Sequence, residues 1–286
     1  SGAVITSDDE GLTWQGRLTD LTNLGGQTLY HMELGTDGHG WAASNYSEYA
    51  DSVAWFQTDD GGRTWQAGNP PPGWFSFFDM VLRDDQTGFM AGYYPGPPYQ
   101  IARTQDGGQS WENLPVPGGL YGARLDSPSA GIVFALFGDS SGLTKVWRSN
   151  NDGDLWQIAA TGLPSTTPLS DLDFVNADVG FTSGGGENSV FYRTTNGGQS
   201  WQSRPAVGLG GYPRQLEFQS ATTGLARCQD GIYRTTDGGA TWQIHLEGFS
   251  WWGLELDAQG RGAALGNTEQ SFMLTEDGGA TWRSLA

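Results

Sequence analysis

The sequence predicts an all-β protein, a β-propeller built from four-stranded antiparallel blades. Three observations support this fold: a nine-residue phrase recurs seven times, apolar residues alternate with period two between the copies, and 45 of the 286 residues are glycine. Repeats of about 40–50 residues that each contain several short strands and tight turns are typical of propeller blades.

The repeated phrase has the form Ser/Thr-x-Asp/Asn-x-Gly-x-Thr/Ser-Trp, and we refer to each copy as a clasp. The hydroxyl and the carboxylate can accept backbone N–H groups inside a turn, glycine tolerates a positive φ, and the tryptophan brings a large apolar surface to the core. The tryptophans are spaced 51, 46, 45, 45, 41 and 40 residues apart. The acidic or amide residues of the clasps are Asp9, Asp60, Asp106, Asn151, Asn196, Asp237 and Asp277, and the tryptophans are Trp14, Trp65, Trp111, Trp156, Trp201, Trp242 and Trp282.

The fourth clasp departs from the pattern. Asn151 replaces the aspartate, Asp152 replaces the first glycine, and Leu155 replaces the hydroxyl residue. We therefore expect this turn to be the weakest of the seven.

A second pattern lies between the clasps, where a glycine followed by an apolar run occurs six times. The positions six and eight residues before each of these glycines are apolar, which indicates a β-strand. Each module is thus predicted to contain strand A, a turn, strand B, a loop, strand C, the clasp and strand D. The six glycines are Gly40, Gly88, Gly131, Gly180, Gly224 and Gly262.

The pattern predicts one propeller domain over residues 1–286. Residues 1–18 hold only a C strand, a clasp and a D strand, so we favour seven blades with an incomplete first blade, with six blades plus a hairpin as the alternative. We expect residues upstream of this sequence, or a partner chain, to supply the missing strands. The predicted full blades cover residues 27–70, 73–116, 118–163, 167–208, 211–248 and 249–286.

Charge and composition exclude several function classes. There are 14 Lys and Arg against 32 Asp and Glu, a formal net charge of −18, which disfavours binding to nucleic acid or to an anionic membrane surface. The single cysteine, Cys228, excludes an intrachain disulfide and a cysteine-based zinc site. No apolar run is long enough for a membrane-spanning helix.

The clasp resembles the Asp box, or BNR repeat, of sialidases and other propellers. Together with the glycine-apolar B strand, it is most similar to the propeller group that includes photosystem II stability/assembly factors, and the resemblance covers the whole chain. It implies seven blades, an extracytoplasmic location (periplasmic, lumenal or secreted), no enzymatic activity, no cofactor, and a protein partner such as a photosynthetic membrane complex. The Asp box is structural in those families, so it supplies no catalytic residue.

Aromatic residues in the D–A and B–C connections are the predicted binding residues. These connections are expected to share one rim of the propeller, where exposed aromatics suit contact with protein or sugar. Alternatively, some of them fold down as plugs between blades. The candidates are Trp74, Tyr94, Tyr99, Trp251 and Trp252.

Acidic residues recur at one position of the A strand, seven residues before the aligned glycine. They are Glu33, Asp173, Glu217 and Glu255. The A strand is the innermost strand of a blade, so these acids are expected to line the central channel, either as a site for a cation or a basic peptide or as a solvated wall. The clasp acids are predicted to cap turns and not to bind metal, because calcium loops supply several oxygens and each clasp offers one carboxylate. No metal site is predicted.

A sialidase-like hydrolase would need clustered arginines as well as catalytic carboxylates. Arg103, Arg148, Arg193 and Arg234 all occur just before a clasp, and this periodicity indicates a structural role. Regular clasps and the lack of a catalytic constellation, together with the resemblance described above, predict a non-enzymatic binding or scaffold propeller, which the resemblance places on a larger extracytoplasmic assembly. The alternative is a glycan-binding or glycoside-hydrolase propeller.

Overall fold

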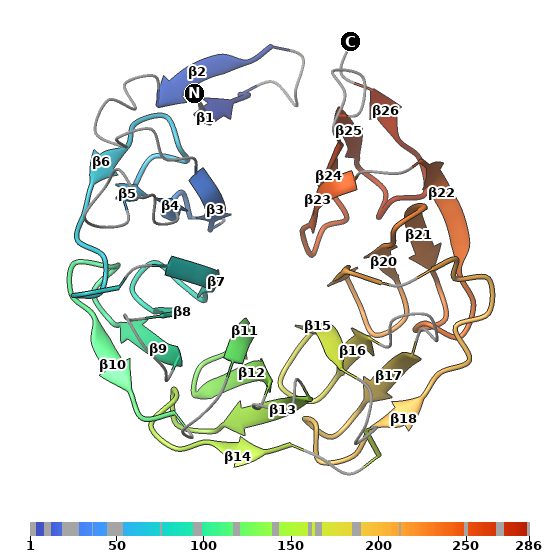
Figure 1. Ribbon diagram of the computed structural model, residues 1–286. Coiled ribbons are helices and arrows are strands. Elements are labelled where there is room, and N and C mark those ends of the chain that lie inside the picture. The colour runs from blue at the N-terminus through green and yellow to red at the C-terminus, as the bar shows by residue number, and fades with distance from the viewer. Residues whose placement is uncertain are drawn as a thin grey trace. The chain divides into compact units, whose positions relative to one another are not determined.

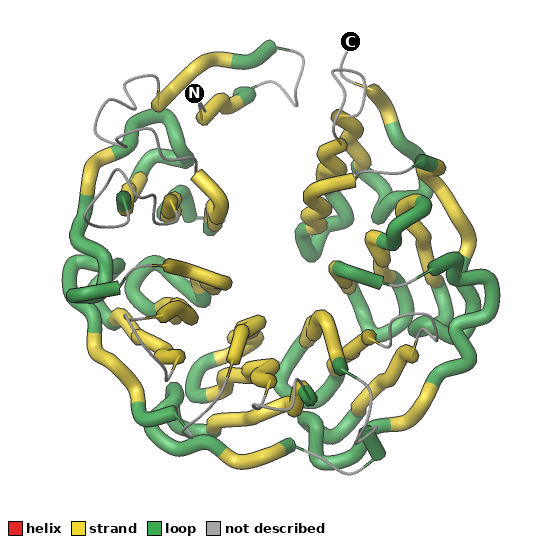
Figure 2. Tube along the Cα trace, in the orientation of Figure 1, coloured by secondary structure: helices red, strands yellow, loops and turns green. Residues whose placement is uncertain are grey.

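A computed structural model describes most of the chain, and strands are its only regular secondary structure. It describes residues 4–8, 13–18, 29–35, 37–44, 54–74, 76–93, 99–116, 121–138, 143–159, 162–163, 168–184, 190–211, 213–248, 251–266 and 272–284. These residues contain no helix, which confirms the all-β class (Figure 2). The described residues therefore contain no membrane-spanning helix.

The strands form one two-stranded sheet and six four-stranded sheets, each four-stranded sheet in chain order (Figure 1). The small sheet pairs β1 (Val4–Thr6) with β2 (Gln15–Leu18). The next three sheets are β3 (Leu29–Leu34), β4 (Gly40–Ser44), β5 (Trp55–Thr58) and β6 (Gln66–Ala67); β7 (Ser76–Leu82), β8 (Gly88–Tyr93), β9 (Tyr99–Thr104) and β10 (Glu112–Leu114); and β11 (Tyr121–Ser129), β12 (Ile132–Gly138), β13 (Thr144–Ser149) and β14 (Gln157–Ile158). The last three are β15 (Leu169–Phe174), β16 (Gly180–Gly184), β17 (Val190–Thr194) and β18 (Gln202–Ser203); β19 (Gln215–Phe218), β20 (Gly224–Arg227), β21 (Gly231–Thr235) and β22 (Gln243–Glu247); and β23 (Trp251–Leu256), β24 (Gly262–Gly266), β25 (Phe272–Thr275) and β26 (Arg283–Ser284).

This topology confirms four-stranded antiparallel blades and corrects the number of blades. The described residues form six blades and not the seven that we favoured. The β1–β2 hairpin is additional to these blades, which agrees with the alternative of six blades plus a hairpin. The hairpin cannot form a blade by itself because it contains only the C strand and the D strand. It is held against the first four-stranded blade, where Val4 packs with Ala42 and Phe56, and where Asp8 pairs with Arg63 at 2.6 Å.

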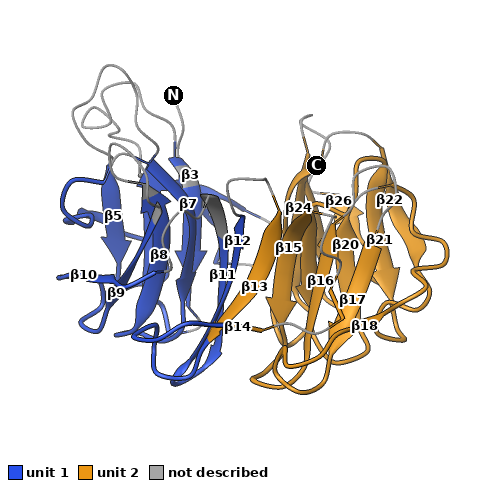
Figure 3. Cartoon of the chain, turned by 60° about the horizontal axis from the view of Figure 1, so that its bottom comes forward, with its two compact units in different colours: residues 1–140, 149–157 blue, residues 141–148, 158–286 orange. Residues whose placement is uncertain are grey.

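The chain divides into two compact units (Figure 3). Each unit has its own aromatic core. Unit 1 comprises residues 1–140 and 149–157, and unit 2 comprises residues 141–148 and 158–286. In unit 1, the indoles of Trp41, Trp55 and Trp111 lie with their ring centroids 5.3–5.5 Å apart. In unit 2, Phe181 and Phe218 stack at 3.6 Å. The prediction of a single domain stays a prediction.

Burial follows the position of a strand in its sheet. The B strands β4 and β16 are buried along their whole length, whereas the D strands β6 and β18 are exposed. The B strand β24 is an exception, because only Ala264 of its five residues is buried.

Six clasps are described, and their geometry confirms that the acidic residue caps the turn. In the second clasp, Thr58 Oγ1 accepts the Gly62 N–H at 2.9 Å and donates to Asp60 Oδ1 at 2.9 Å. Asp60 also accepts the Thr64 N–H at 2.8 Å, and the Trp65 indole donates to the Gly62 carbonyl at 2.9 Å. The same Ser/Thr-to-glycine bond recurs in the other five clasps, and Asp9 of the first clasp lies outside the described residues.

The clasp tryptophans differ in burial. Trp201 and Trp242 are core residues, Trp65, Trp111, Trp156 and Trp282 are half-buried, and Trp14 of the hairpin is exposed. The expectation that the clasp tryptophan brings its apolar surface to the core therefore holds fully for Trp201 and Trp242 and only in part for the others.

The A strands contain a feature that the sequence pattern did not predict. In β3, β7, β11, β15 and β23, the register shifts close to the start of the strand, so that two residues of the A strand oppose one residue of the B strand. In β23, for example, Trp251 pairs with Gly266 while Gly253 pairs with Leu265, which leaves Trp252 as the extra residue. Such a β-bulge interrupts the alternation of side chains and redirects one of them.

Candidate functional site

The five predicted aromatic binding residues have different locations. Trp74 is 2% exposed and packs with Phe77 at 5.9 Å, so its prediction as a binding residue is wrong: the indole is part of the unit 1 core. Tyr94 lies outside the described residues, and Tyr99 begins β9 but its side chain is not among those described. Trp251 is partly buried against the core that contains Leu254.

Among the predicted binding residues whose side chains the structure describes, Trp252 alone is exposed to solvent. It is 68% exposed, the highest exposure of any described tryptophan. The bulge accounts for this exposure, because the extra residue of β23 is free from the alternation that directs Trp251 and Leu254 toward the core.

Other bulge residues of unit 2 lie at the same end of neighbouring A strands. Ser170 is the extra residue of β15, and β15, β19 and β23 are consecutive neighbours. Just before β19, the Arg214 N–H donates to the carbonyl of Arg227, the residue that pairs with Gln215, so two residues face one here too. We refer to Ser170, Arg214 and Trp252 as the bulge row.

Hydrogen bonds from neighbouring strands hold the backbone at this end of the A strands. Ser170 Oγ donates to the Pro213 carbonyl at 2.9 Å, and Arg227 Nη1 donates to the Trp251 carbonyl at 3.0 Å. The Arg214 side chain is exposed, as is that of Trp252. The bulge row therefore offers a cation and a large aromatic side chain on a fixed backbone.

Below the bulge row, aspartates connect successive A strands. Asp171 Oδ2 accepts the Leu216 N–H at 2.6 Å, and Asp173 accepts the Phe218 N–H. In unit 1, Asp79 accepts the Leu125 N–H at 2.7 Å in the same way. These N–H groups point away from the B strand, on the open edge of the sheet, and each carboxylate satisfies a donor that the sheet leaves unpaired.

Three of the four predicted channel acids lie together in unit 2. Burial raises the pKa of Glu217 well above its usual range, and the negative charges of Glu255, Asp173 and Asp171 raise it further. Gln215 Nε2 donates to Glu217 Oε1 at 3.0 Å and also bonds the Leu254 carbonyl on β23. Glu255 is exposed, and Glu33 lies half-buried on β3 in unit 1.

Unit 1 has a different group of titratable residues on its A strands. Burial and the positive charge of Arg124 lower the pKa of His31 to about 4. Burial raises the pKa of Asp79 to about 6, against the opposing effect of Arg124. Arg124 also donates to the Phe78 carbonyl at 3.3 Å. At neutral pH this group therefore contains an uncharged imidazole, a carboxylate and a guanidinium.

The periodic arginines connect blades to one another. Arg103 bonds the Asp152 carbonyl at 2.9 Å, Arg148 the Gly197 carbonyl at 2.8 Å, and Arg234 the Gly278 carbonyl at 2.7 Å. Each reaches the clasp of the next blade, 44 to 49 residues along the chain. These arginines therefore act at separate clasps and do not form a carboxylate-binding cluster.

Sequence comparisons identify no family. No model of a known protein family matches the chain, and no curated protein matches it.

Solved structures share the fold. A structure described as YCF48 bound to D1 peptide aligns with 90% of this chain and 81% of its own, with a TM-score of 0.64 and 17% identity. An ancestral GH74 enzyme aligns with 99% of this chain and 43% of its own, with a TM-score of 0.67 and 15% identity. The Hadza microbial sialidase Hz136 aligns with 84% of this chain and 58% of its own, with a TM-score of 0.53 and 17% identity. At these identities the likeness shows the fold alone: the chain has the β-propeller fold that YCF48, the GH74 enzyme and the sialidase share.

Proposed function

We propose that this chain is a non-enzymatic binding propeller that docks on a larger extracytoplasmic protein assembly, such as a photosynthetic membrane complex. The observation that carries the proposal is the exposed Trp252, which shares the bulge row of neighbouring A strands with the exposed Arg214. Tryptophan and arginine are the residue types enriched in interface hot spots, and a backbone held by neighbouring strands loses little entropy on contact.

Two further observations support the same function. The structural similarity includes YCF48 bound to a peptide, so a propeller of this type is compatible with a protein ligand. The clasps have the chemistry of the Asp box, and on this proposal they are that repeat. Asp171 and Asp173 bond backbone N–H groups of the next strand, which favours a structural role over catalysis for them.

The test compares two exposed apolar residues. Trp252→Ala should weaken partner capture from native membranes about thirtyfold, the equivalent of about 2 kcal/mol, with an unchanged melting temperature. The matched control is Leu155→Ala, because Leu155 is 70% exposed but lies in a clasp and not on the bulge row. If both variants capture the partner as the wild type does, the bulge row is not the docking surface.

A glycoside hydrolase is the second candidate, and Glu217 is the observation that favours it. A carboxyl whose pKa is raised by burial and by neighbouring acidic residues is the arrangement in which a glycosidase keeps its general acid protonated. The proposal predicts no turnover of fluorogenic glycosides. Turnover that Glu217→Gln abolishes would establish the hydrolase instead.

A further inference from the structure

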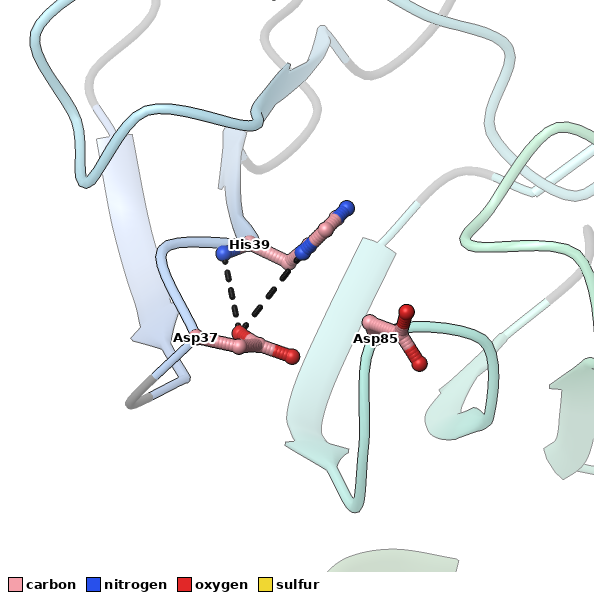
Figure 4. Close-up of side chains that lie close together, drawn as sticks. All are labelled: Asp37, His39 and Asp85. Carbon is pink, nitrogen blue, oxygen red and sulfur yellow. Dashed lines mark hydrogen bonds and ion pairs between the residues drawn. The ribbon is translucent and has the colours of Figure 1, made fainter.

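Two successive A–B turns of unit 1 bring a histidine and two aspartates together (Figure 4). Asp37 and His39 lie in the turn between β3 and β4, and Asp85 lies in the turn between β7 and β8. One ligand atom from each side chain falls within 4.8 Å of the other two.

The turns themselves require only one of these three side chains. Asp37 Oδ1 accepts the His39 N–H at 3.0 Å and so caps its turn. In the next turn the cap is Asp84, whose Oδ1 accepts the N–H groups of Gln86 and Thr87, and Asp85 is not used.

Equivalent turns elsewhere in the chain contain other residues at these positions. The residue three before the aligned glycine is Asp85 in the second blade but Ala177 and Ala221 in the fourth and fifth. The residue just before that glycine is His39 in the first blade but Thr87 and Thr223 in the second and fifth. The fold therefore does not require a carboxylate at position 85 or an imidazole at position 39.

Neither side chain is fully used by the surrounding protein. His39 Nδ1 is inaccessible to solvent and has no hydrogen-bond partner in the described part of the chain, although Asp37 Oδ1 lies 3.7 Å away. On the other side of the ring, Nε2 is 3.4 Å from Asp59 Oδ1. Within the described ranges, the Asp85 carboxylate has no hydrogen bond or ion pair. An orphaned imidazole nitrogen thus faces carboxylates that could share a cation with it.

We propose that Asp37, His39 and Asp85 bind a divalent first-row transition metal ion, with His39 Nδ1 as the nitrogen ligand. Tetrahedral metal–ligand bonds of about 2.0–2.2 Å separate two ligand atoms of one ion by about 3.3–3.6 Å. Each pair of ligand atoms, now within 4.8 Å, must therefore approach by up to about 1.5 Å, which rotation of these side chains can supply. One imidazole and two carboxylates suit zinc or manganese, whereas calcium takes oxygen ligands only. The two carboxylates balance the charge of the ion, and the ion joins the turns of two successive blades.

The experiment is isothermal titration of tag-free protein with zinc chloride. We expect one ion per chain, and at least a tenfold loss of affinity in His39→Thr and in Asp85→Ala. These variants introduce residues that the chain already uses in equivalent turns, so both should fold. His245→Gln is the control for loss of an imidazole elsewhere and should bind as the wild type does.

Thermal melting provides a second measurement. Zinc should raise the melting temperature of the wild type and of His245→Gln but not that of His39→Thr, because an ion that binds only the folded state stabilises it. Equal zinc affinity in the wild type, His39→Thr and Asp85→Ala would overturn the proposal. Calcium binding at this site as tight as zinc binding would overturn the assignment to a transition metal.

Discussion

At the scale of the residue, the clasps tolerate different partners because a hydroxyl can both donate and accept. Thr64 and Thr281 donate to the second oxygen of Asp60 and Asp277. In the fifth clasp the direction is reversed, and Asn196 Nδ2 donates to Ser200 Oγ at 2.9 Å. The contact survives the change from carboxylate to amide because the serine hydroxyl takes the opposite role.

The fourth clasp lacks this second contact. Asn151 Oδ1 still accepts the Leu155 N–H at 3.0 Å, but leucine has no hydroxyl that could accept a hydrogen bond from the Asn151 side-chain amide. The Leu155 side chain is instead 70% exposed. Asp152 also adopts a φ of 54°, a left-handed conformation that aspartate tolerates better than most residues but less well than glycine. Both features agree with the expectation that this clasp is the weakest.

Leu155→Thr should therefore stabilise the protein. The new hydroxyl can accept from Asn151 as Ser200 accepts from Asn196, and the free energy of unfolding should rise by about 0.5–1 kcal/mol. Guanidinium unfolding measures the change. Leu155→Val is the control, because valine has the branched shape of threonine but no hydroxyl. Equal stability of Leu155→Thr and Leu155→Val would contradict the role of the hydrogen bond.

At the scale of the element, the A strands are connected through side-chain carboxylates. The open edge of an A strand has no neighbouring strand within its own sheet, and the acid of the preceding blade supplies the acceptor. This structural role explains why Asp79, Asp171 and Asp173 occur on A strands without any ligand being involved.

Asp171→Ala should lower the free energy of unfolding by about 1–3 kcal/mol, because it leaves the buried Leu216 N–H without an acceptor. Asp171→Asn retains an acceptor oxygen and should cost much less. Chemical denaturation gives the energies, and hydrogen exchange at Leu216 locates the change. An asparagine variant as unstable as the alanine variant would show that charge, and not the hydrogen bond, matters here.

The sequence predicted the strands and clasps because each recurs at the same position in every repeat, so that errors at one blade are corrected by the others. Features of single blades were not predictable in this way. Trp74 precedes a strand, as an exposed loop residue would, but its indole turns inward to Phe77. The bulge that exposes Trp252 adds one residue to an otherwise alternating pattern, and the grouping of Asp171 with Glu217 requires knowledge of which strands are neighbours.

At the scale of the whole molecule, two sets of carboxyl groups respond to pH in opposite directions. Hydrogen bonds from Thr64 and Thr281 lower the pKa of Asp60 and Asp277 to about 2, so their contribution is lost as pH falls from about 4 toward 2. Glu217 has a raised pKa, so its folded form retains a proton that the unfolded chain has already released. Its ionisation destabilises the fold as pH rises above the usual glutamate range.

His31 and Asp79 make opposing contributions to the pH dependence of stability. The lowered pKa of His31, about 4, destabilises the fold as pH falls from 6.5 to about 4. The raised pKa of Asp79, about 6, stabilises it as pH falls from about 6 to 3.8. Because the two effects oppose each other, we expect the raised pKa of Glu217 to set the trend in stability above pH 4.

The melting temperature should therefore be higher at pH 5 than at pH 8 and should fall steeply below about pH 3.5. The chain has a formal net charge of −18 at pH 7, and protonation of acidic groups as the pH falls from 8 to 5 reduces their mutual repulsion. This effect also favours a higher melting temperature at pH 5. Calorimetry across this range, on the wild type and on Glu217→Gln, tests the assignment. The variant should lose much of the difference between pH 5 and pH 8, and an unchanged difference would exclude Glu217 as its source.

The bulge at the start of the A strands has an evolutionary consequence. A protein made of repeated units must acquire differences between them without disturbing the packing that they share. The extra residue of each A strand lies outside the alternating pattern, so mutation there is separated from the selection that maintains the core. The chain already has a different amino acid at this position in every blade: Tyr30, Phe78, Gly122, Ser170, Arg214 and Trp252. The six described blades share one scaffold, and a single substitution at this position could give one of them a new ligand without changing the packing of the others.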